Sequence, residues 1–185
     1  SYRLSDLKSL VKYANNKNVS ANLTDRFPNP YTKEDARKWL DFVTKYEPET
    51  NFAIASSDEV IGGIGFEPKK DVYRVSAEIG YWLGEPFWGK GIATLALAAT
   101  TEFAFERFGF ERIYAGVFDS NPASARVLEK AGYVCECRMR RSAIKDGQVV
   151  DQLPVPVGHD RRGSRRPTGG GRRPAPGGAA PGAAA

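Results

Sequence analysis

The chain has 185 residues, of which 41% are hydrophobic and 11% aromatic, a composition typical of a folded globular protein. Its formal net charge of +5 comes entirely from residues 154–185, which hold six Arg and one acidic residue. Residues 1–153 are charge-balanced, so they give no electrostatic indication of a nucleic-acid partner. No stretch reaches the roughly 20 apolar residues of a transmembrane helix, and no membrane-spanning segment is expected.

The N-terminus and the cysteines indicate a cytoplasmic protein. No apolar segment of a secretory signal follows the first residues, and because the initiator Met is missing, this end is expected to be trimmed. Cys135 and Cys137 lie two residues apart in a stretch typical of a strand, so we expect reduced structural thiols. With His159 as the sole histidine, a metal site is not expected either.

In chain order, the spacing of apolar residues predicts a short helix over residues 4–14, followed by a long ordered loop over 15–31. Thr32 and Asp35 form a near capping box at the start of the next helix. Later elements are, in order: antiparallel strands over 51–55, 59–66 and 72–83, a helix over 92–108, a strand over 111–118, a helix capped by Asn121, and strands over 133–142 and 148–153. This order predicts a mixed α/β layered domain rather than a doubly wound sheet.

The composition changes abruptly at Pro154. Of the 32 residues from there on, 26 are Gly, Pro, Arg or Ala, and such a segment cannot bury enough apolar surface to fold. Pro154 and Pro156 are expected to interrupt the closing strand, because proline has no N–H for the ladder. We therefore predict a domain over residues 1–153 and a disordered tail over 154–185. Its origin stays open between a basic arm that contacts ribosomal RNA, a tail without function, and a non-native end from a frameshift or cloning.

The segment from Trp88 to Thr94 (Trp-Gly-Lys-Gly-Ile-Ala-Thr) has the pattern of an anion-binding loop. A predicted strand leads in, a helix leads out, and the glycines let the backbone approach a ligand. The unpaired N–H groups and the dipole of the helix start suit a pyrophosphate. A plain helix start after a glycine turn is the alternative. A Walker A loop fits poorly, because Gly91 stands where Ser or Thr would hold Mg²⁺.

Several motifs in order resemble the RimJ/RimL-like branch of the GNAT acyl-CoA N-acyltransferases. Residues 86–94 match its Pro-aromatic-Trp-Gly-Lys-Gly-x-Ala-Thr pattern, with Trp88 where other GNAT proteins carry Arg or Gln. Further similar segments are residues 26–32, 79–83 and 121–133. The likeness covers about residues 4–153. It implies the GNAT fold, with a central, mostly antiparallel sheet, helices on both faces, and a first strand cut short at this N-terminus.

The resemblance implies transfer of an acetyl group from acetyl-CoA to a primary amine in a ternary complex, without a metal. The acceptor would be a protein N-terminus or a small molecule, and a homodimer is compatible with the family. The resemblance assigns cofactor binding to Asn121 and to Tyr81, Trp82 and Leu83, whose strand backbone would pair with the pantetheine arm. It also assigns this role to Trp88, Gly89, Lys90, Gly91, Ile92, Ala93 and Thr94 in the loop.

The resemblance also suggests catalytic residues. Many GNAT enzymes protonate the departing thiolate with a Tyr, but Leu128 occupies that position, so Ser124 is the candidate, with Asn121 as an orienting contact. The helix dipole at Ser124 would also favour a thiolate. Helix capping alone is the alternative for both residues. Glu78 is the candidate general base, and its alternative role is to pair with a nearby cation.

The loop over residues 15–31 is expected to wall the acceptor site, where Arg26, Phe27 and Tyr31 would shape the pocket. A late acidic residue of the family aligns with Ala143. Because that residue and the usual Tyr are absent, a non-catalytic acyl-CoA-binding or interaction module on the same fold is the alternative function.

Overall fold

A six-stranded sheet in the order β1-β2-β3-β4-β6-β5 forms the centre of the computed structural model, which describes residues 1–158. β3 and β4 pair in parallel, and all other neighbours pair antiparallel, which confirms the mostly antiparallel sheet. The strands are β1 (Asn51–Ala55), β2 (Val60–Pro68), β3 (Ser76–Leu83), β4 (Arg112–Phe118), β5 (Met139–Lys145) and β6 (Gln148–Gly158).

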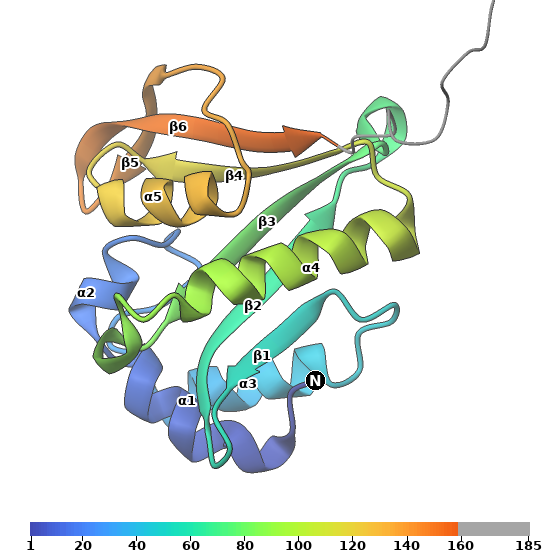
Figure 1. Ribbon diagram of the computed structural model, residues 1–185. Helices are drawn as coiled ribbons and strands as arrows, with labels where there is room; N and C mark the ends of the chain where they lie inside the picture. Colours follow the sequence, from blue (N-terminus) through green and yellow to red (C-terminus); the bar gives the residue numbers. More distant parts are fainter. Residues whose placement is uncertain (159–185) are drawn as a thin grey trace, which may run out of the picture.

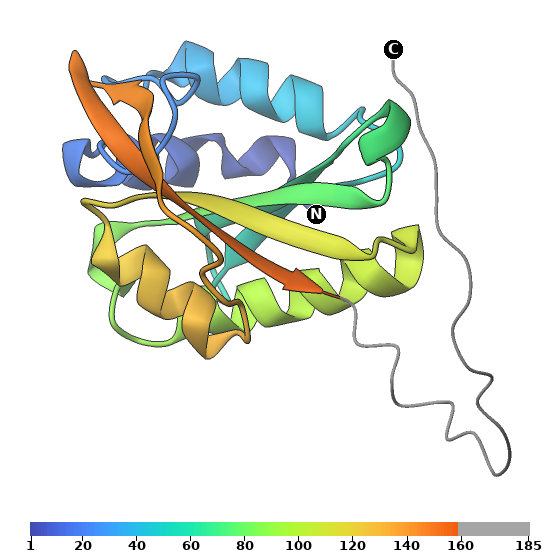
Figure 2. The ribbon, with the colours of Figure 1, turned by 90° about the horizontal axis from the view of Figure 1, so that it is seen from above.

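Helices cover both faces of the sheet, as expected (Figures 1 and 2). One face carries α1 (Leu7–Ala14) and α3 (Lys33–Val43), and the other carries α4 (Ile92–Phe108) and α5 (Pro122–Lys130). α2 (Lys17–Ser20) is a single turn within the segment that was expected to be a loop. It forms because the Asn16 side chain accepts a hydrogen bond from the Asn18 N–H and so caps the turn. Short 3₁₀ turns cover Leu4–Asp6, Asp71–Tyr73 and Glu85–Phe87.

The alternation of side chains along the strands divides the buried residues into two cores. On β3, Ile79 and Leu83 belong to the core beneath α4 and α5, together with Leu97 and Leu128. Trp82 points the other way and packs against the core beneath α1 and α3. Successive side chains on β3 therefore face opposite sides of the sheet.

The parallel pairing of β3 with β4 is short and leaves an opening in the sheet. It covers three residue pairs and ends at Glu78 and Tyr114. On the β4 side, the Val75 carbonyl accepts hydrogen bonds from the N–H groups of Glu111 and Arg112. On the β2 side, the Gly84 N–H donates a hydrogen bond to the Ile61 carbonyl. Because backbone groups alternate between the two edges of a strand, the N–H and C=O groups of Ile79 and Tyr81 face the opening.

The last strand extends beyond Leu153, the expected end of the domain. β6 continues through Pro154 and Pro156 to Gly158, and it pairs with β4 along this whole stretch. The carbonyls of both prolines accept hydrogen bonds from the N–H groups of Val134 and Glu136, on the side away from β4. The missing proline N–H groups therefore cost no bond to β4, and the expectation that they interrupt the strand was wrong.

The prolines instead affect the neighbouring segment, residues 133–138. It was predicted to belong to a strand, but it has no regular strand structure, and β5 starts only at Met139. A second boundary also differs, since β3 starts at Ser76 and the 3₁₀ turn Asp71–Tyr73 occupies the expected start. The rest of the predicted disordered tail, residues 159–185, lies outside the described residues.

Candidate active site

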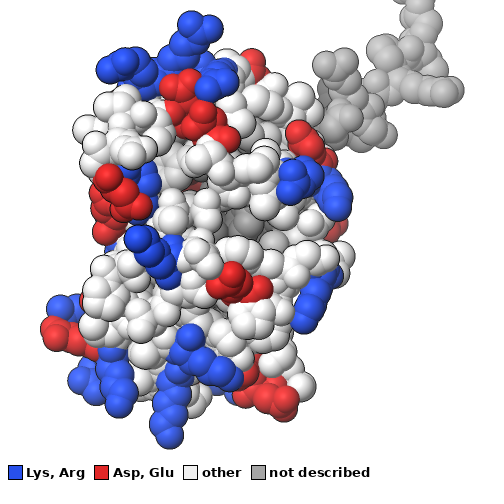
Figure 3. Space-filling model, turned by 90° about the vertical axis from the view of Figure 1, so that its left-hand side faces the viewer, with Lys and Arg blue, Asp and Glu red and all other residues white. Residues whose placement is uncertain are grey.

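A cavity of about 1350 Å³ connects the glycine loop before α4 with the opposite face of the sheet. Its lining includes the loop residues, both sides of the opening between β3 and β4, and the segment over residues 22–28 together with the exposed face of α3. Figure 3 shows one face of the molecule, which is hollowed near its centre and bordered by side chains of both charges.

The start of α4 has the geometry of an anion site. Gly91 is its N-cap residue, with φ of 78°, and Gly89 has φ of 75°, conformations that favour glycine. No side chain caps the helix, and no atom lies within 4 Å of where a side chain at either glycine would begin. The first-turn N–H groups therefore remain available to a phosphate group.

Two residues of the loop, Trp88 and Lys90, have contacts within the protein. The Trp88 indole N–H donates a hydrogen bond of 2.7 Å to the Leu83 carbonyl, which fastens the loop to the end of β3. The Lys90 ammonium lies 5.6 Å from the centre of the Phe87 ring. Every expected cofactor-binding residue except Lys90 lines the cavity, and Trp88 and Leu83 are in addition joined by the indole hydrogen bond.

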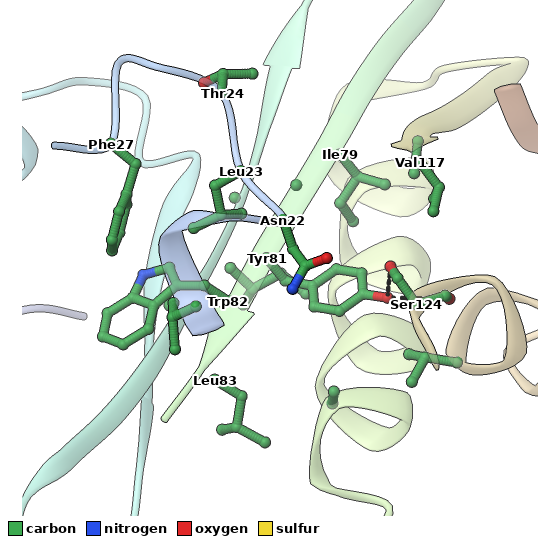
Figure 4. Close-up of a pocket in the computed structure, with 18 of the residues that line it drawn as sticks. Asn22, Leu23, Thr24, Phe27, Ile79, Tyr81, Trp82, Leu83, Val117 and Ser124 are labelled. Atoms are coloured by element: carbon green, nitrogen blue, oxygen red, sulfur yellow. Dashed lines mark hydrogen bonds between the residues drawn. The ribbon is translucent and has the colours of Figure 1, made fainter. Parts of the chain in front are cut away.

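Tyr81 and Ser124 meet across the opening (Figure 4). The two side-chain oxygens lie 2.7 Å apart, and either can donate in this pair. The Tyr81 hydroxyl also donates to the Ser124 carbonyl oxygen at 3.3 Å. The Ser124 N–H donates to Asn121 Oδ1 at 3.0 Å, so Asn121 caps α5 as predicted. Burial raises the pKa of Tyr81, although the hydrogen bond to Ser124 acts in the opposite direction.

Glu78 lines the cavity at the point where β3 and β4 separate. Its carboxylate forms an ion pair of 2.6 Å with Lys69 and accepts a longer hydrogen bond, 3.4 Å, from the Tyr114 hydroxyl. Burial acts to lower the pKa of Lys69, but the hydrogen bond and the charge of Glu78 together raise it. The predicted pairing of Glu78 with a cation is therefore present, with Lys69 as the partner.

The expected acceptor residues lie on the face of the sheet beneath α3. The Phe27 ring is 5.1 Å from Tyr31 and 5.6 Å from Trp82, between ring centres, and Arg26 lies 3.9 Å from Glu67 at the exposed rim. Trp82 was expected among the cofactor-binding residues. The resemblance gives this role to the backbone of the strand. The Trp82 side chain lies on the acceptor face with Phe27, and Figure 4 shows it directed away from Tyr81.

The sequence did not indicate that glycines clear the acceptor face beside the opening. At Gly80, no atom lies within 4 Å of the position that a Cβ would occupy. At Gly116, the nearest atoms to that position are Gln152 Nε2 at 3.6 Å and Glu78 Oε1 at 3.9 Å. The Gln152 side chain was also missed, because only the pairing of β6 with β4 brings it to the cavity.

Polar contacts hold the segment that walls the acceptor side. The amides of Asn16 and Asn18 donate to the Glu85 carboxylate at 2.7 and 3.0 Å, which joins α2 to the turn before the glycine loop. At the other end of the wall, Lys145 at the tip of the β5–β6 hairpin pairs with Asp25 at 2.9 Å. No local pattern predicts these contacts, since each joins residues far apart in the chain.

The arrangement suits an enzyme that brings a phosphate-bearing donor and a second substrate together through an opening in a sheet. The family model described as "Acetyltransferase (GNAT) domain" matches residues 1–134. The chain belongs to this family of acetyltransferases, which supports its assignment as an acetyltransferase enzyme.

Relatives of known sequence support this assignment to the family. The chain is 36% identical over 136 residues to "Probable N-acetyltransferase YjcK" of Bacillus subtilis, a match that covers 69% of the chain and 73% of the relative. It is 34% identical over 85 residues to the ribosomal-protein-serine acetyltransferase of Escherichia coli, covering 46% of the chain and 47% of that relative. Two further Bacillus relatives are also matched over about half their length, 52% and 54%.

Among solved structures, the chain is similar to RimL, the ribosomal L7/L12 alpha-N-protein acetyltransferase in complex with coenzyme A. The TM-score is 0.75 and the identity 22%, over 86% of this chain and 92% of that one. This likeness shows the same fold, as the motifs had indicated.

Two expected absences stay predictions. Within residues 1–158, no group of three or more His, Cys, Asp or Glu side chains is placed to hold a metal ion. In the same part of the chain, no helix has the length and apolar character needed to cross a membrane.

Proposed function

We propose that the chain transfers an acetyl group from acetyl-CoA to a primary amine, by direct transfer in a ternary complex. The observation that carries the proposal is the single cavity that joins the glycine loop to the acceptor face through the opening beside Tyr81 and Ser124. Two substrates that enter from opposite faces would meet at this opening. A covalent relay on the enzyme is then unnecessary.

The residues present fit the donor. The uncapped start of α4 and the bare Gly89 and Gly91 suit a pyrophosphate, and the backbone groups of Ile79 and Tyr81 suit an amide-bearing arm. When bound, acetyl-CoA supplies the activated acetyl thioester. A main-chain N–H at the opening would stabilise the charge that develops on its carbonyl oxygen.

Two side chains would handle the amine proton and the negative charge on the departing sulfur, Glu78 and Ser124 respectively. As the nitrogen–carbon bond forms and the carbon–sulfur bond breaks, Glu78 accepts the amine proton, directly or through a water molecule. Ser124, in the first turn of α5, donates a hydrogen bond to the sulfur, which the helix dipole also favours as an anion. The sulfur finally takes its proton from solvent. No metal is required.

The acceptor is a protein N-terminus or a small-molecule amine. Phe27, Tyr31 and Trp82 form an aromatic wall, and the Glu78 carboxylate, which is paired with Lys69, is the acidic group beside the opening. The E. coli relative named for a ribosomal protein makes a ribosomal N-terminal peptide the first acceptor to test. Spermidine and small aromatic amines complete the panel.

Calorimetry and turnover test the proposal together. We expect acetyl-CoA to bind with measurable heat, Mg-ATP to give none, and at least one amine of the panel to be acetylated. Ser124→Ala should lower turnover at least about tenfold while the affinity for CoA stays near normal, and Glu78→Gln should lower turnover without loss of CoA binding. Binding of Mg-ATP in place of acetyl-CoA, or no acetylation of any amine, would contradict the proposal.

A further inference from the structure

We propose that Tyr81 is a positioning residue that orients the Ser124 hydroxyl toward the sulfur of the leaving group. The inference rests on the proposed function, because it assigns a task to a contact within the same site. It starts from two hydrogen bonds that connect β3 to α5 across the opening in the sheet.

Tyr81 lies beyond the last pair of residues that join β3 to β4, and its side chain spans the opening (Figure 4). Its hydroxyl reaches both oxygens of one residue, Ser124 Oγ at 2.7 Å and the Ser124 carbonyl at 3.3 Å. The Ser124 N–H donates its hydrogen bond to Asn121 Oδ1. Backbone and side chain of Ser124 are thus fixed by two different partners.

The direction of the shorter bond decides what Ser124 can do. The Tyr81 hydroxyl has one proton and two acceptors within reach, Ser124 Oγ at 2.7 Å and the Ser124 carbonyl oxygen at 3.3 Å. We assign this proton to the closer oxygen, Oγ. Like any tyrosine, Tyr81 is protonated and able to donate at neutral pH, and burial raises its pKa further. If Tyr81 donates to Oγ, the proton of Ser124 is free to point into the cavity that this residue lines.

In this arrangement Tyr81 assists catalysis by orienting the Ser124 hydroxyl, and not by giving a proton to the leaving group. A serine hydroxyl without a partner samples several rotamers, and most of them direct the proton away from the reacting sulfur. A hydroxyl held by a donor also becomes a somewhat better donor itself, because hydrogen bonds in a chain polarise one another. Tyr81 needs no contact with substrate for this effect.

The decisive variant is Tyr81→Phe, which keeps the ring and removes the hydroxyl. We expect kcat to fall about tenfold while KM for acetyl-CoA stays unchanged, because an interaction present only in the transition state is weakened. In the Ser124→Ala background, the same substitution should have no further effect on kcat. Additive losses in this double-mutant cycle would contradict a role that acts through Ser124.

Tyr133→Phe is the matched control. Its hydroxyl also lies 2.7 Å from a side-chain hydroxyl, that of Thr101, but within the core between α4 and the end of α5. The control should lower stability and leave kcat unchanged. A similar loss of kcat in both tyrosine variants would mean that general loosening of the core, and not orientation of Ser124, explains the result.

A measurement without turnover complements the kinetics. In urea unfolding, the effects of Tyr81→Phe and Ser124→Ala should be non-additive, because either one removes the same hydrogen bond. If the unaltered protein acetylates an amine but Tyr81→Phe matches it in kcat, this inference is overturned and the proposed function stands. If the unaltered protein acetylates nothing, both are overturned.

Discussion

Gly80 shows how a single missing side chain shapes the acceptor face. A glycine in the middle of a strand lowers stability by about 0.5–1 kcal/mol relative to Ala, so a strand interior does not favour it. The structure supplies a functional reason, because the position of a Cβ at Gly80 is surrounded by open space beside the separating strands. Gly116 on β4 likewise adds no side chain to this part of the acceptor face.

We therefore expect Gly80→Ala and Gly80→Val to fold at least as stably as the parent but to bind the amine less well. KM for the amine should rise in the order of side-chain size, by about tenfold for Val, if its methyl groups remove roughly one well-placed contact. KM for acetyl-CoA should stay constant. Steady-state kinetics with both substrates varied checks this, and an equal rise in both KM values would contradict it.

Buried tyrosines predict a loss of stability in alkali. Burial raises the pKa of Tyr133 to about 12, although its hydrogen bond to Thr101 opposes the shift. The unfolded chain ionises near pH 10. The contribution of Tyr133 is therefore complete below pH 10 and is lost as the pH rises toward 12.

Urea unfolding at pH 8 and pH 11 measures this effect. The parent should lose stability between the two values, and Tyr133→Phe should lose less, because Phe cannot ionise. Some loss should remain in the variant, since burial also raises the pKa of Tyr31 to about 12. At pH 8 the substitution itself should cost about 1 kcal/mol for the lost hydrogen bond. An identical alkaline loss in both proteins would be inconsistent with the assignment.

At the scale of elements, the two ends of α4 allow an effect on stability to be distinguished from an effect on ligand binding. A glycine in the left-handed conformation flanks each end, but only the N-terminal one lies at the cavity. Gly91 at the N-terminal end has φ of 78°, and Gly109 at the C-terminal end has φ of 67°. Neither position has an atom within 4 Å of where a side chain would begin. An Ala at either site therefore meets the same backbone strain without a steric clash.

Gly91→Ala and Gly109→Ala should each cost about 1 kcal/mol of stability, because a Cβ disfavours the left-handed conformation. Only Gly91→Ala should also weaken CoA binding, since it alters the end of the helix that faces the cavity. Thermal unfolding and calorimetry with CoA check the pair. Equal CoA affinity in the two variants would show that the glycine loop does not hold the pyrophosphate.

Local signals predicted the elements well where the cause is local. Thr32 and Asp35 form the expected capping box, Asn121 caps α5, and α4 ends at Phe108 as predicted, just before Gly109. α2 was missed because it is only four residues long, too short for a hydrophobic period. The start of β3 was misplaced because β-branched and aromatic residues also occur in the 3₁₀ turn before it.

At the scale of the whole molecule, the site depends on contacts that no local pattern contains. The loop residues 88–94 could be singled out from the sequence, because glycine spacing itself creates their geometry. The contact between Tyr81 and Ser124 joins residues 43 apart and exists only because β3 and β4 diverge. Gln152 reaches the cavity only because β6 crosses beside β4. Sequence patterns thus indicate which chemistry is present, while the sheet topology decides which groups meet.

The closing strand gives a direct test of where the folded unit ends. Residues 154–158 pair with Arg112–Gly116 of β4, and their proline carbonyls hold Val134 and Glu136. Val155 is almost fully buried in the core, opposite Ala115 of β4. A chain that stops at Leu153 loses this pairing, leaves the N–H groups of residues 134 and 136 without protein partners, and exposes part of the core.

We therefore expect a chain of residues 1–158 to unfold cooperatively and a chain of residues 1–153 to be strongly destabilised or unfolded. The loss of buried Val155 alone should cost about 1.5–3 kcal/mol, and the broken backbone ladder adds to it. Circular dichroism and urea unfolding of the two chains make the comparison. Val155→Ala in the longer chain separates the contribution of the side chain from that of the ladder. Equal stability of the two chains would place the end of the folded unit at Leu153, as the prolines had suggested.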